Sequence, residues 1–207
     1  NRVLMTVDGI RMPRSYDSRA AIFDREYLSL ELVKRVELLR GPASALYSSD
    51  ALAGGVNFVT YNPEDFLRAG DAGEPKTLGG RAAVQWAGEN DGKTLAATVA
   101  GRAGDVAQWM LTASASRSHA TETMGSNNAP NADRTTANPE HDRDQALLAK
   151  LVLHPGSGQR HTLTLEHVQR HANTELLSSR TVRPSRPGDV LRESSRYAAG
   201  RDRLAWD

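Results

Sequence analysis

The sequence predicts a small α+β unit followed by antiparallel β-strands of an incomplete transmembrane β-barrel. Up to about residue 62 the elements are short and of mixed type, whereas from residue 81 onward segments with period-two alternation of apolar and polar residues recur. The connections between these segments, apart from the first, alternate between short and long. Bacterial outer-membrane barrels show this alternation because their turns are tight on one side and their loops are long on the other.

The first unit begins with a strand over residues 2–7 (RVLMTV), and Asp8-Gly9 after it is a turn signal. Residues 24–34 carry clustered apolar side chains behind a possible N-cap at Asp24, which favours a short helix. Further along, one helical turn from Ser44 and a strand over residues 56–60 are expected.

The composition changes after this unit. Between residues 63 and 80 the pattern dissolves into Asp, Glu, Gly, Pro and Lys, which is typical of a linker. We therefore divide the chain into a first unit at 1–62, a linker at 63–80 and a strand region at 81–207. The chain starts at Asn1 without an initiator Met or an apolar leader, so we expect it to be a fragment.

The strand region contains segments of about the length that a tilted membrane-spanning strand needs. They cover residues 81–87, 94–101, 107–116, 146–154 and 161–169, with a further start at Asp202. No run of about twenty apolar residues occurs, so no transmembrane helix is expected.

Alternation divides these segments into two faces, of which one is apolar and the other polar. The apolar face holds Val84, Trp86, Leu95, Ala97, Val99, Trp109, Leu111, Ala113, Leu147, Ala149, Leu151, Leu153, Leu163 and Leu165. The opposite face holds Gln85, Thr94, Thr98, Gln108, Thr112, Ser114, Lys150, Thr162, Thr164 and Glu166. If the first strand runs outward, the turns at 103–106 and 155–159 fall on the inner side, and the long loops at 117–144 and 172–200 fall outside.

Composition excludes several classes of function. Lys and Arg number 26 against 25 Asp and Glu without a basic block, so binding of nucleic acid is not expected. The chain has no cysteine, which excludes disulfides, thiolate metal sites and Cys nucleophiles. Phosphate loops, nucleophile elbows and paired metal-ligand motifs are also missing from the sequence, so we expect no enzyme, no intrinsic cofactor and no metal site.

One run of residues resembles a known family. Residues 32–47 (LVKRVELLRGPASALY), continued by SSDALAGGVNFVT, resemble the late-plug signature of TonB-dependent receptors, and residues 7–11 (VDGIR) resemble the strand and turn that precede it. Tyr47-Ser48-Ser49 departs from the usual Tyr-Gly-Ser. The resemblance implies that residues 1–62 are the C-terminal part of a plug domain and that residues 81–207 are the first strands and outer loops of a barrel. The motif positions are Glu37, Arg40, Gly41, Pro42, Tyr47, Gly54, Gly55 and Asn57.

Two roles follow for this motif. Its glycines permit positive φ and close approach of neighbouring strands. Glu37 and Arg40 would face a polar barrel lumen, where ionic contacts with the wall can hold the plug while remaining breakable. An ordinary solvated ion pair at a strand end is the alternative for these two residues.

Residues 13–14 (Pro-Arg) and 17–18 (Asp-Ser) look most like the subfamily that takes up haem, haemoglobin and related iron-carrying proteins. The resemblance implies an outer-membrane receptor and transporter energised by TonB. Its partners would be TonB, outer-membrane lipid, and haem or a haemoglobin-like host protein, with haem as the transported ligand. A ferric-siderophore receptor and a non-transporting surface-binding barrel protein are the alternatives.

All six histidines lie between residues 119 and 171. Haem iron accepts a neutral imidazole or a Tyr phenolate, so histidines on the outer side are candidate haem contacts. By the expected topology these are His119, His141, His167 and His171, whereas His154 and His161 flank an inner turn. The alternative for each loop histidine is a solvated polar residue.

Overall fold

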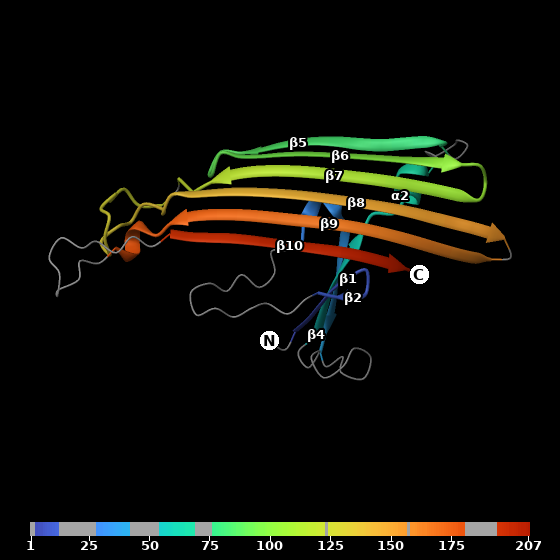
Figure 1. Ribbon diagram of the computed structural model, residues 1–207, viewed down its shortest axis with the longest axis horizontal. Coiled ribbons are helices and arrows are strands. Elements are labelled where there is room, and N and C mark those ends of the chain that lie inside the picture. The colour runs from blue at the N-terminus through green and yellow to red at the C-terminus, as the bar shows by residue number, and fades with distance from the viewer. Residues whose placement is uncertain are drawn as a thin grey trace.

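The computed structural model describes residues 3–12, 28–41, 54–68, 76–122, 124–156, 158–180 and 194–207. Two sheets dominate these residues: a six-stranded antiparallel sheet, here the long-strand sheet, and a four-stranded mixed sheet, here the N-terminal sheet. Figure 1 shows the N-terminal sheet crossing beneath the middle of the long-strand sheet.

The long-strand sheet is a meander in the order β10-β9-β8-β7-β6-β5. All six segments expected as strands are confirmed, and each is longer than expected because backbone pairing continues past the apolar residues. Their bounds are β5 Leu78–Ala87, β6 Gly92–Ala103, β7 Ala107–His119, β8 Glu140–Gly156, β9 Gln159–Glu175 and β10 Ser194–Trp206. Parts of both predicted long loops are therefore strand; for example, His119 pairs directly with His141.

The connections fall on the sides that the sequence predicts. The short β6–β7 and β8–β9 turns lie at one end of the long-strand sheet, and the long β7–β8 and β9–β10 connections lie at the other, seen on the right and left of Figure 1. The short β5–β6 turn shares the end with the long loops, because His119 at the end of β7 donates its backbone N–H to the carbonyl of Asn90.

The N-terminal sheet has the order β2-β1-β4-β3. Its elements are β1 Val3–Val7, β2 Ile10–Arg11, a 3₁₀ turn at Leu30–Leu32, β3 Val33–Arg40 and β4 Gly54–Thr60. β1 runs parallel to β4, which runs antiparallel to β3. Asp8 and Gly9 both have positive φ, 48° and 78°, so the predicted turn is of the primed kind that suits a two-residue hairpin.

The helix expected over residues 24–34 is wrong in its described part. Leu30–Leu32 is a single 3₁₀ turn, and Val33 already begins β3. Pairing of β3 with the whole of β4 begins at Val33, and this pairing overrides the local preference for a helix. Residues 24–27 and the helical turn expected from Ser44 lie outside the described residues.

The segment expected as a linker contains one short helix, α2 Glu64–Leu67. Leu67 is buried, and Phe66 packs against the same core. This core lies between the two sheets and joins Leu32, Leu67, Ala100, Met110, Ala146, Leu148 and Val168. The division into domains at 62 and 80 stays a prediction.

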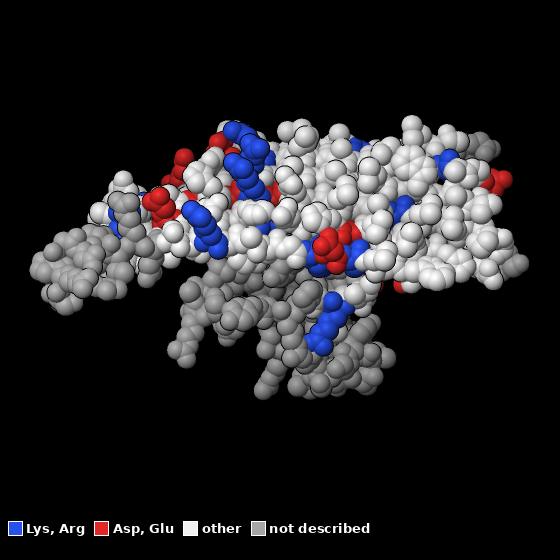
Figure 2. Space-filling model, in the orientation of Figure 1, with Lys and Arg blue, Asp and Glu red and all other residues white. Residues whose placement is uncertain are grey.

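The outer face of the long-strand sheet exposes large apolar side chains, and its inner face buries polar side chains beside the apolar core. Apolar side chains on its outer face are exposed, from 36% at Leu153 to 80% at Val84, whereas Thr112, Thr164 and Glu166 on the face toward the N-terminal sheet are at most 4% exposed. Figure 2 shows a largely uncharged surface over much of the long strands, with charged groups toward the end that carries the long loops and a further charged group at the middle of the lower edge.

The apolar stretch of the outer face has an inclined boundary. On β6 the last outward-facing charged residue before this stretch is Lys93, and on β10 it is Asp202, although strand pairing places Lys93 in one row with Ala198. Between the end strands β6 and β10 the boundary therefore shifts by about 13 Å along the strands over about 19 Å of sheet width, an inclination of about 35°, while on β7 and β8 the last outward charged residues, Arg117 and Arg143, lie in the row of Lys93. Strands of transmembrane barrels are tilted by roughly 35–45°. On the strands between β6 and β10, the boundary of the apolar stretch passes next to Arg117, Gln145 and His167.

The apolar stretch is close in length to the apolar band of an outer-membrane barrel. From Leu95 to Ala103 the apolar stretch runs for about 26 Å along β6. Projected on an axis inclined by about 35° to the strand, this length is about 21 Å, and the apolar band of outer-membrane barrels is about 25 Å tall. Trp86 is paired with Lys93 and lies on the outer face near the boundary toward the long loops. Trp109 and Trp206 lie toward the end with the short turns. Among the described residues, no helix is long and apolar enough to cross a membrane.

Candidate functional site

The two sheets meet through a group of charged side chains, here the Asp8 cluster. Asp8 comes from the β1–β2 turn of the N-terminal sheet, and the other members come from the inner face of the long-strand sheet, on β8, β9 and β10. The cluster comprises Asp8, Lys150, Glu166, Arg201 and Arg203.

The primed turn directs the Asp8 carboxylate back across its own sheet. Thr60, at the end of β4, donates its backbone N–H to Oδ1 at 2.8 Å and its hydroxyl to Oδ2 at 2.6 Å. These two hydrogen bonds hold the turn against the last residue of β4. They also orient the second oxygen toward the long-strand sheet.

Two cations of the long-strand sheet reach the same carboxylate. Arg203 Nη2 lies 2.8 Å from Asp8 Oδ2, and Lys150 Nζ lies 3.6 Å from it. Arg203 also donates to the backbone carbonyl of Val7 at 3.3 Å. The side chains of Lys150 and Arg203 are only 5% and 6% exposed, so these contacts are shielded from water.

Burial alone raises the pKa of Asp8. The positive charge of Lys150 and the hydrogen bonds from Thr60 and Arg203 oppose this effect and outweigh it, so the pKa of Asp8 lies below its ordinary value. Asp8 is therefore an anion at neutral pH, as pairing with two buried cations requires.

Glu166 completes the cluster from β9. Its side chain is fully buried and lies between two arginines: it pairs with Arg201, and Arg203 Nε donates to its Oε2 at 2.9 Å. Arg203 therefore bridges the carboxylate of one sheet and the carboxylate of the other. Removing one partner from such a buried pair leaves an uncompensated charge, which typically costs about 3–5 kcal/mol.

A second set of polar contacts lies beside the cluster. Lys150 Nζ also donates to Asn62 Oδ1 at 3.0 Å, and Arg160 pairs with Glu64 of α2 at 3.1 Å. Arg81 of β5 donates to the hydroxyl of Tyr61 at 3.1 Å and lies 4.6 Å from the centre of the Tyr61 ring. The interface is thus mostly polar and ionic around a small apolar core.

The motif residues of the N-terminal sheet organise that sheet itself. Asn57 on β4 accepts hydrogen bonds from the Thr6 hydroxyl at 2.8 Å and the Gly9 backbone at 3.0 Å, and donates to Glu37 at 3.0 Å. It therefore ties β1, the β1–β2 turn and β3 together. Glu37 also pairs with Arg35 at 2.8 Å.

Glu37 is exposed, and hydrogen bonds from Asn57 and then Arg35 lower its pKa. In the described residues these partners belong to the N-terminal sheet, so the contact to the long-strand sheet runs through Asp8 instead. Arg40 ends β3 with an exposed side chain, and Gly41 follows it with φ 95°. Pro42 and Tyr47 lie outside the described residues.

Gly54 shows why its position has no side chain. Its φ is 125°, and a Cβ on it would lie 2.3 Å from the backbone oxygen of Leu39 on the neighbouring strand. Gly55, the next residue, has only ordinary contacts around the same position. Of the two motif glycines in β4, Gly54 is the one that the packing requires.

The four candidate histidines all lie on the outer face of the long-strand sheet or at its rim. The rings of His119 and His141 lie 4.9 Å apart, edge to face, and His119 Nδ1 is 3.9 Å from Asp91. His167 bonds to Asp202 at 2.7 Å, and His171 pairs across strands with Arg143. The strands therefore bring His119 and His141 together, and they do not bring these two together with His167.

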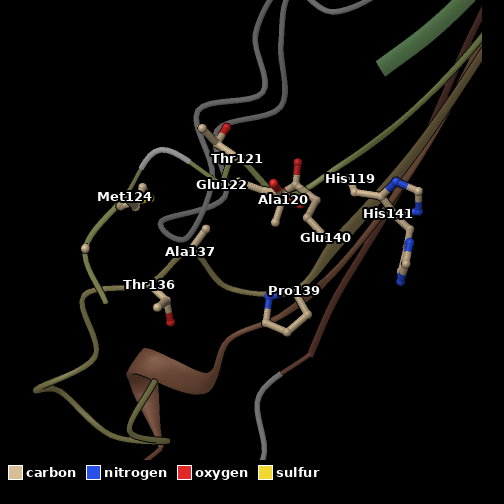
Figure 3. Close-up of a pocket in the computed structure, with 11 residues that line it drawn as sticks. His119, Ala120, Thr121, Glu122, Met124, Thr136, Ala137, Pro139, Glu140 and His141 are labelled. Carbon is tan, nitrogen blue, oxygen red and sulfur yellow. The ribbon is translucent and has the colours of Figure 1, made fainter. Parts of the chain in front are cut away.

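A cavity of about 450 Å³ adjoins the His119–His141 pair. The β7–β8 connection folds over it, and Figure 3 shows the two imidazoles together at one side of the loop residues that line it. These loop residues are Ala120, Thr121, Glu122, Met124, Gly125, Thr136, Ala137, Pro139 and Glu140. Among the described residues, no three His, Asp or Glu side chains are placed to hold a metal ion.

Sequence reasoning missed the Asp8 cluster. Asp8 was assigned to a turn, and Lys150 and Glu166 were assigned to a polar face without partners. The available signal was a set of charged residues within strands whose neighbours are apolar, as in Ala-Lys-Leu at 149–151. Arg201 and Arg203 lie in such a strand too.

Comparison with known proteins bears on the N-terminal part. Residues 1–55 match the family model described as TonB-dependent Receptor Plug Domain. The chain is 39% identical over 64 residues to the vitamin B12 transporter BtuB of Vibrio vulnificus (strain CMCP6), covering 31% of this chain and 10% of that protein.

It is also 34% identical over 113 residues to transferrin-binding protein A of Neisseria meningitidis serogroup B (strain ATCC BAA-335 / MC58), covering 50% of this chain and 12% of that protein. The same protein of Neisseria gonorrhoeae shows 34% identity over 113 residues. The chain thus spans about a tenth of the length of the curated relatives it matches. Residues 1–55 thus match the plug domain of TonB-dependent receptors, and the chain is homologous to these proteins over the matched residues.

Proposed function

We propose that the protein is a TonB-dependent outer-membrane receptor that takes up an iron-bearing ligand, haem or a haem-carrying protein. One observation carries the proposal: a sheet whose outer face exposes apolar side chains, and whose inner face buries many polar and charged side chains around a small apolar core, packs against a plug domain. In water this distribution would be unfavourable, because apolar surface would stay exposed while polar groups were buried. In a barrel that spans a bilayer the same distribution is favourable, because the apolar outer face contacts lipid and the polar inner face contacts the plug.

The inclined boundary supports the same reading. An inclination of about 35° and an apolar band of about 21 Å agree with strands that cross a membrane at a barrel's tilt. The sheet described here has open edges at β5 and β10. Since lipid does not tolerate open edges, the working protein needs further strands that close the barrel.

The Asp8 cluster suits a plug that must stay in place and yet move. Ionic contacts are strong while they are shielded and weaken as soon as water enters, because the effective dielectric constant rises. A pulling force transmitted by TonB through the plug would therefore weaken the contact between Asp8 and Arg203 as soon as it admits water. The proposed transport needs no bound nucleotide or catalytic residue in this part of the chain.

For the ligand, the outer end of the sheet is the relevant region. His119 and His141 lie at a cavity under the β7–β8 connection and offer the imidazoles that haem iron accepts. His167 and His171 lie on the same face of the sheet but do not line this cavity. We therefore assign the haem-contacting role to His119 and His141 ahead of the other two. Two of the relatives named above are transferrin-binding proteins, which favours an iron source over other cargo.

The test is a haem titration of the full-length protein in detergent, followed by Soret absorption. His119→Ala and His141→Ala are expected to weaken saturable binding, whereas His154→Ala, at the opposite end of β8, should leave it unchanged. Uptake of haem iron by cells should in addition require TonB. If the protein bound a ferric siderophore and not haem, the proposed ligand would be wrong and the proposed receptor function would stand. Uptake without TonB would overturn the proposed function.

A further inference from the structure

A row of cationic side chains crosses the outer face of the long-strand sheet. Strand pairing places Lys93 opposite Arg117 and Arg117 opposite Arg143, and these three residues are here the cation row; His171 lies opposite Arg143 on the fourth strand. All four side chains are exposed and point to the same side of the sheet, away from the plug.

Such a row is unfavourable by itself. Side chains directly opposite on antiparallel strands have Cβ atoms about 4.5–5.5 Å apart, and like charges at that spacing repel. Among the described residues, Arg117 and Arg143 have no ion-pair partner; Asp142 and Asp144, the carboxylates on either side of Arg143, point to the inner face and pair with Arg170. Asp91 pairs with Lys93 at 3.1 Å, and Glu89, Glu122 and Glu175 are further exposed acidic residues near this end of the sheet.

The position of the row shows what faces it. Lys93 and Arg117 are the last charged residues before the apolar stretch, whose next outward members are Leu95 and Ala115, and Arg143 lies one outward position beyond Gln145. Trp86, an amphipathic ring of the kind that lies at membrane interfaces, is paired with Lys93. In Figure 2 the Lys and Arg side chains at this end border the uncharged surface.

We propose that the cation row binds the phosphate groups of lipid headgroups in the outer leaflet of the membrane. Guanidinium groups match phosphate oxygens in a two-point geometry, and two adjacent arginines suit a lipid that carries more than one phosphate. The acyl chains of the same lipid would lie along the apolar face below the row. The phosphates would thereby neutralise the repulsion within the row.

This inference rests on the proposed function only in requiring that the outer face is embedded in a membrane. It assigns to Arg117 and Arg143 a role outside ligand uptake, in fixing the height of the barrel in the leaflet. Basic side chains at this level can also extend toward the headgroups while their methylene groups stay in contact with apolar surface.

The experiment compares two double variants of the full-length protein that lose the same charge. Arg117→Gln with Arg143→Gln alters the row, and Arg68→Gln with Lys76→Gln alters exposed cations at the opposite end of the sheet. The immobilised protein in detergent is incubated with bis-phosphorylated lipid A, with the same lipid after removal of its phosphates, and with inorganic phosphate as competitor. Retained lipid is then quantified.

The wild-type protein and the Arg68/Lys76 variant are expected to retain the phosphorylated lipid preferentially. The Arg117/Arg143 variant should lose affinity by about tenfold or more, since two charge-assisted contacts are removed. Equal retention by both variants, or equal retention of both lipids by the wild type, would overturn the proposal. Complete displacement by inorganic phosphate would show a site for free phosphate and would also overturn it.

Failure of this inference is distinguishable from failure of the proposed function. Both variants are first checked for recovery in the outer-membrane fraction and for the heat-dependent electrophoretic shift of a folded barrel. A protein that passes both checks but does not discriminate between the lipids refutes the inference alone. A wild-type protein that never reaches the outer membrane refutes the receptor itself.

Discussion

Arg203 Nη2 lies 2.8 Å from the carboxylate of Asp8, although 195 positions separate the two residues. Asp8 belongs to the turn of a two-strand hairpin in the plug, and Arg203 belongs to the last described strand of the long-strand sheet. Because Arg203 also bonds to Glu166, it connects a turn of the plug directly to the inner face of two neighbouring strands. The position of the plug against that face therefore depends on a small number of charged groups.

The first prediction concerns the loss of that charge. Asp8→Asn leaves Lys150 and Arg203 without their counter-charge in a shielded environment, so we expect the free energy for opening the β1–β2 region to fall by about 3 kcal/mol. Hydrogen–deuterium exchange of residues 3–11 in the full-length protein measures this free energy locally.

Asp105→Asn is the matched control, because Asp105 is an exposed residue in the short β6–β7 turn. This variant should change exchange in residues 3–11 by less than about 0.5 kcal/mol, as surface substitutions usually do. Equal exchange in both variants would show that the ion pair contributes no stability to the position of the plug.

The second prediction is a dependence on pH. The pKa of Asp8 in the folded protein lies below its ordinary value, so between the two values the unfolded chain binds more protons than the folded one. The stability contributed by Asp8 is therefore fully present above about pH 4, the ordinary value, and is lost as the pH falls through the folded value. Thermal unfolding of wild type and Asp8→Asn, compared at pH 7, 5 and 3, should show a difference that shrinks only at the lowest pH. A difference that persists undiminished would contradict the assignment.

The third prediction separates two glycines of the plug. Gly54→Ala would place a Cβ 2.3 Å from the backbone of Leu39 at a φ of 125°, whereas Gly9→Ala meets no atom within 4 Å at a φ of 78°. Gly9→Ala should cost about 1–2 kcal/mol from backbone strain alone, and Gly54→Ala should cost more, because β3 must also shift. Susceptibility of the plug to limited proteolysis ranks the two variants. A Gly54 variant as resistant as the Gly9 variant would show that β3 gives way without cost.

The strands of the long-strand sheet were predictable because each is a local pattern. Alternation along segments such as 107–116 and 161–169 defines both the strand and its two faces, and loop lengths define the sides. The segment at 28–34 was not predictable in the same way. Its clustered apolar residues fit a helix, and only pairing with β4, which is distant in sequence, makes it a turn and a strand.

The site was less predictable than the fold. The motif gave Asn57 and Glu37, yet their partners became apparent only when β1, β3 and β4 were side by side. The pairing of Asp8 with Arg203 depends on how the plug lies against the sheet, and no sequence spacing encodes that. Alternation does place His119, Arg117 and Arg143 on the outer face, but the expected long loop over 117–144 hid this relationship.

The fourth prediction tests the membrane-facing assignment with two positions on one strand. Leu151 lies within the apolar stretch of the outer face on β8, and Gln145 lies at its boundary on the same face. In a bilayer, Leu151→Arg should reduce the free energy of unfolding by about 2–4 kcal/mol, and Gln145→Arg should reduce it by about 0–1 kcal/mol. The cost of a charge depends on its depth in the membrane. If the outer face were in water, both changes would stay within about 0.5 kcal/mol. Urea unfolding of the full-length protein refolded into lipid vesicles gives both values, and their difference decides whether this face is in contact with lipid or with water.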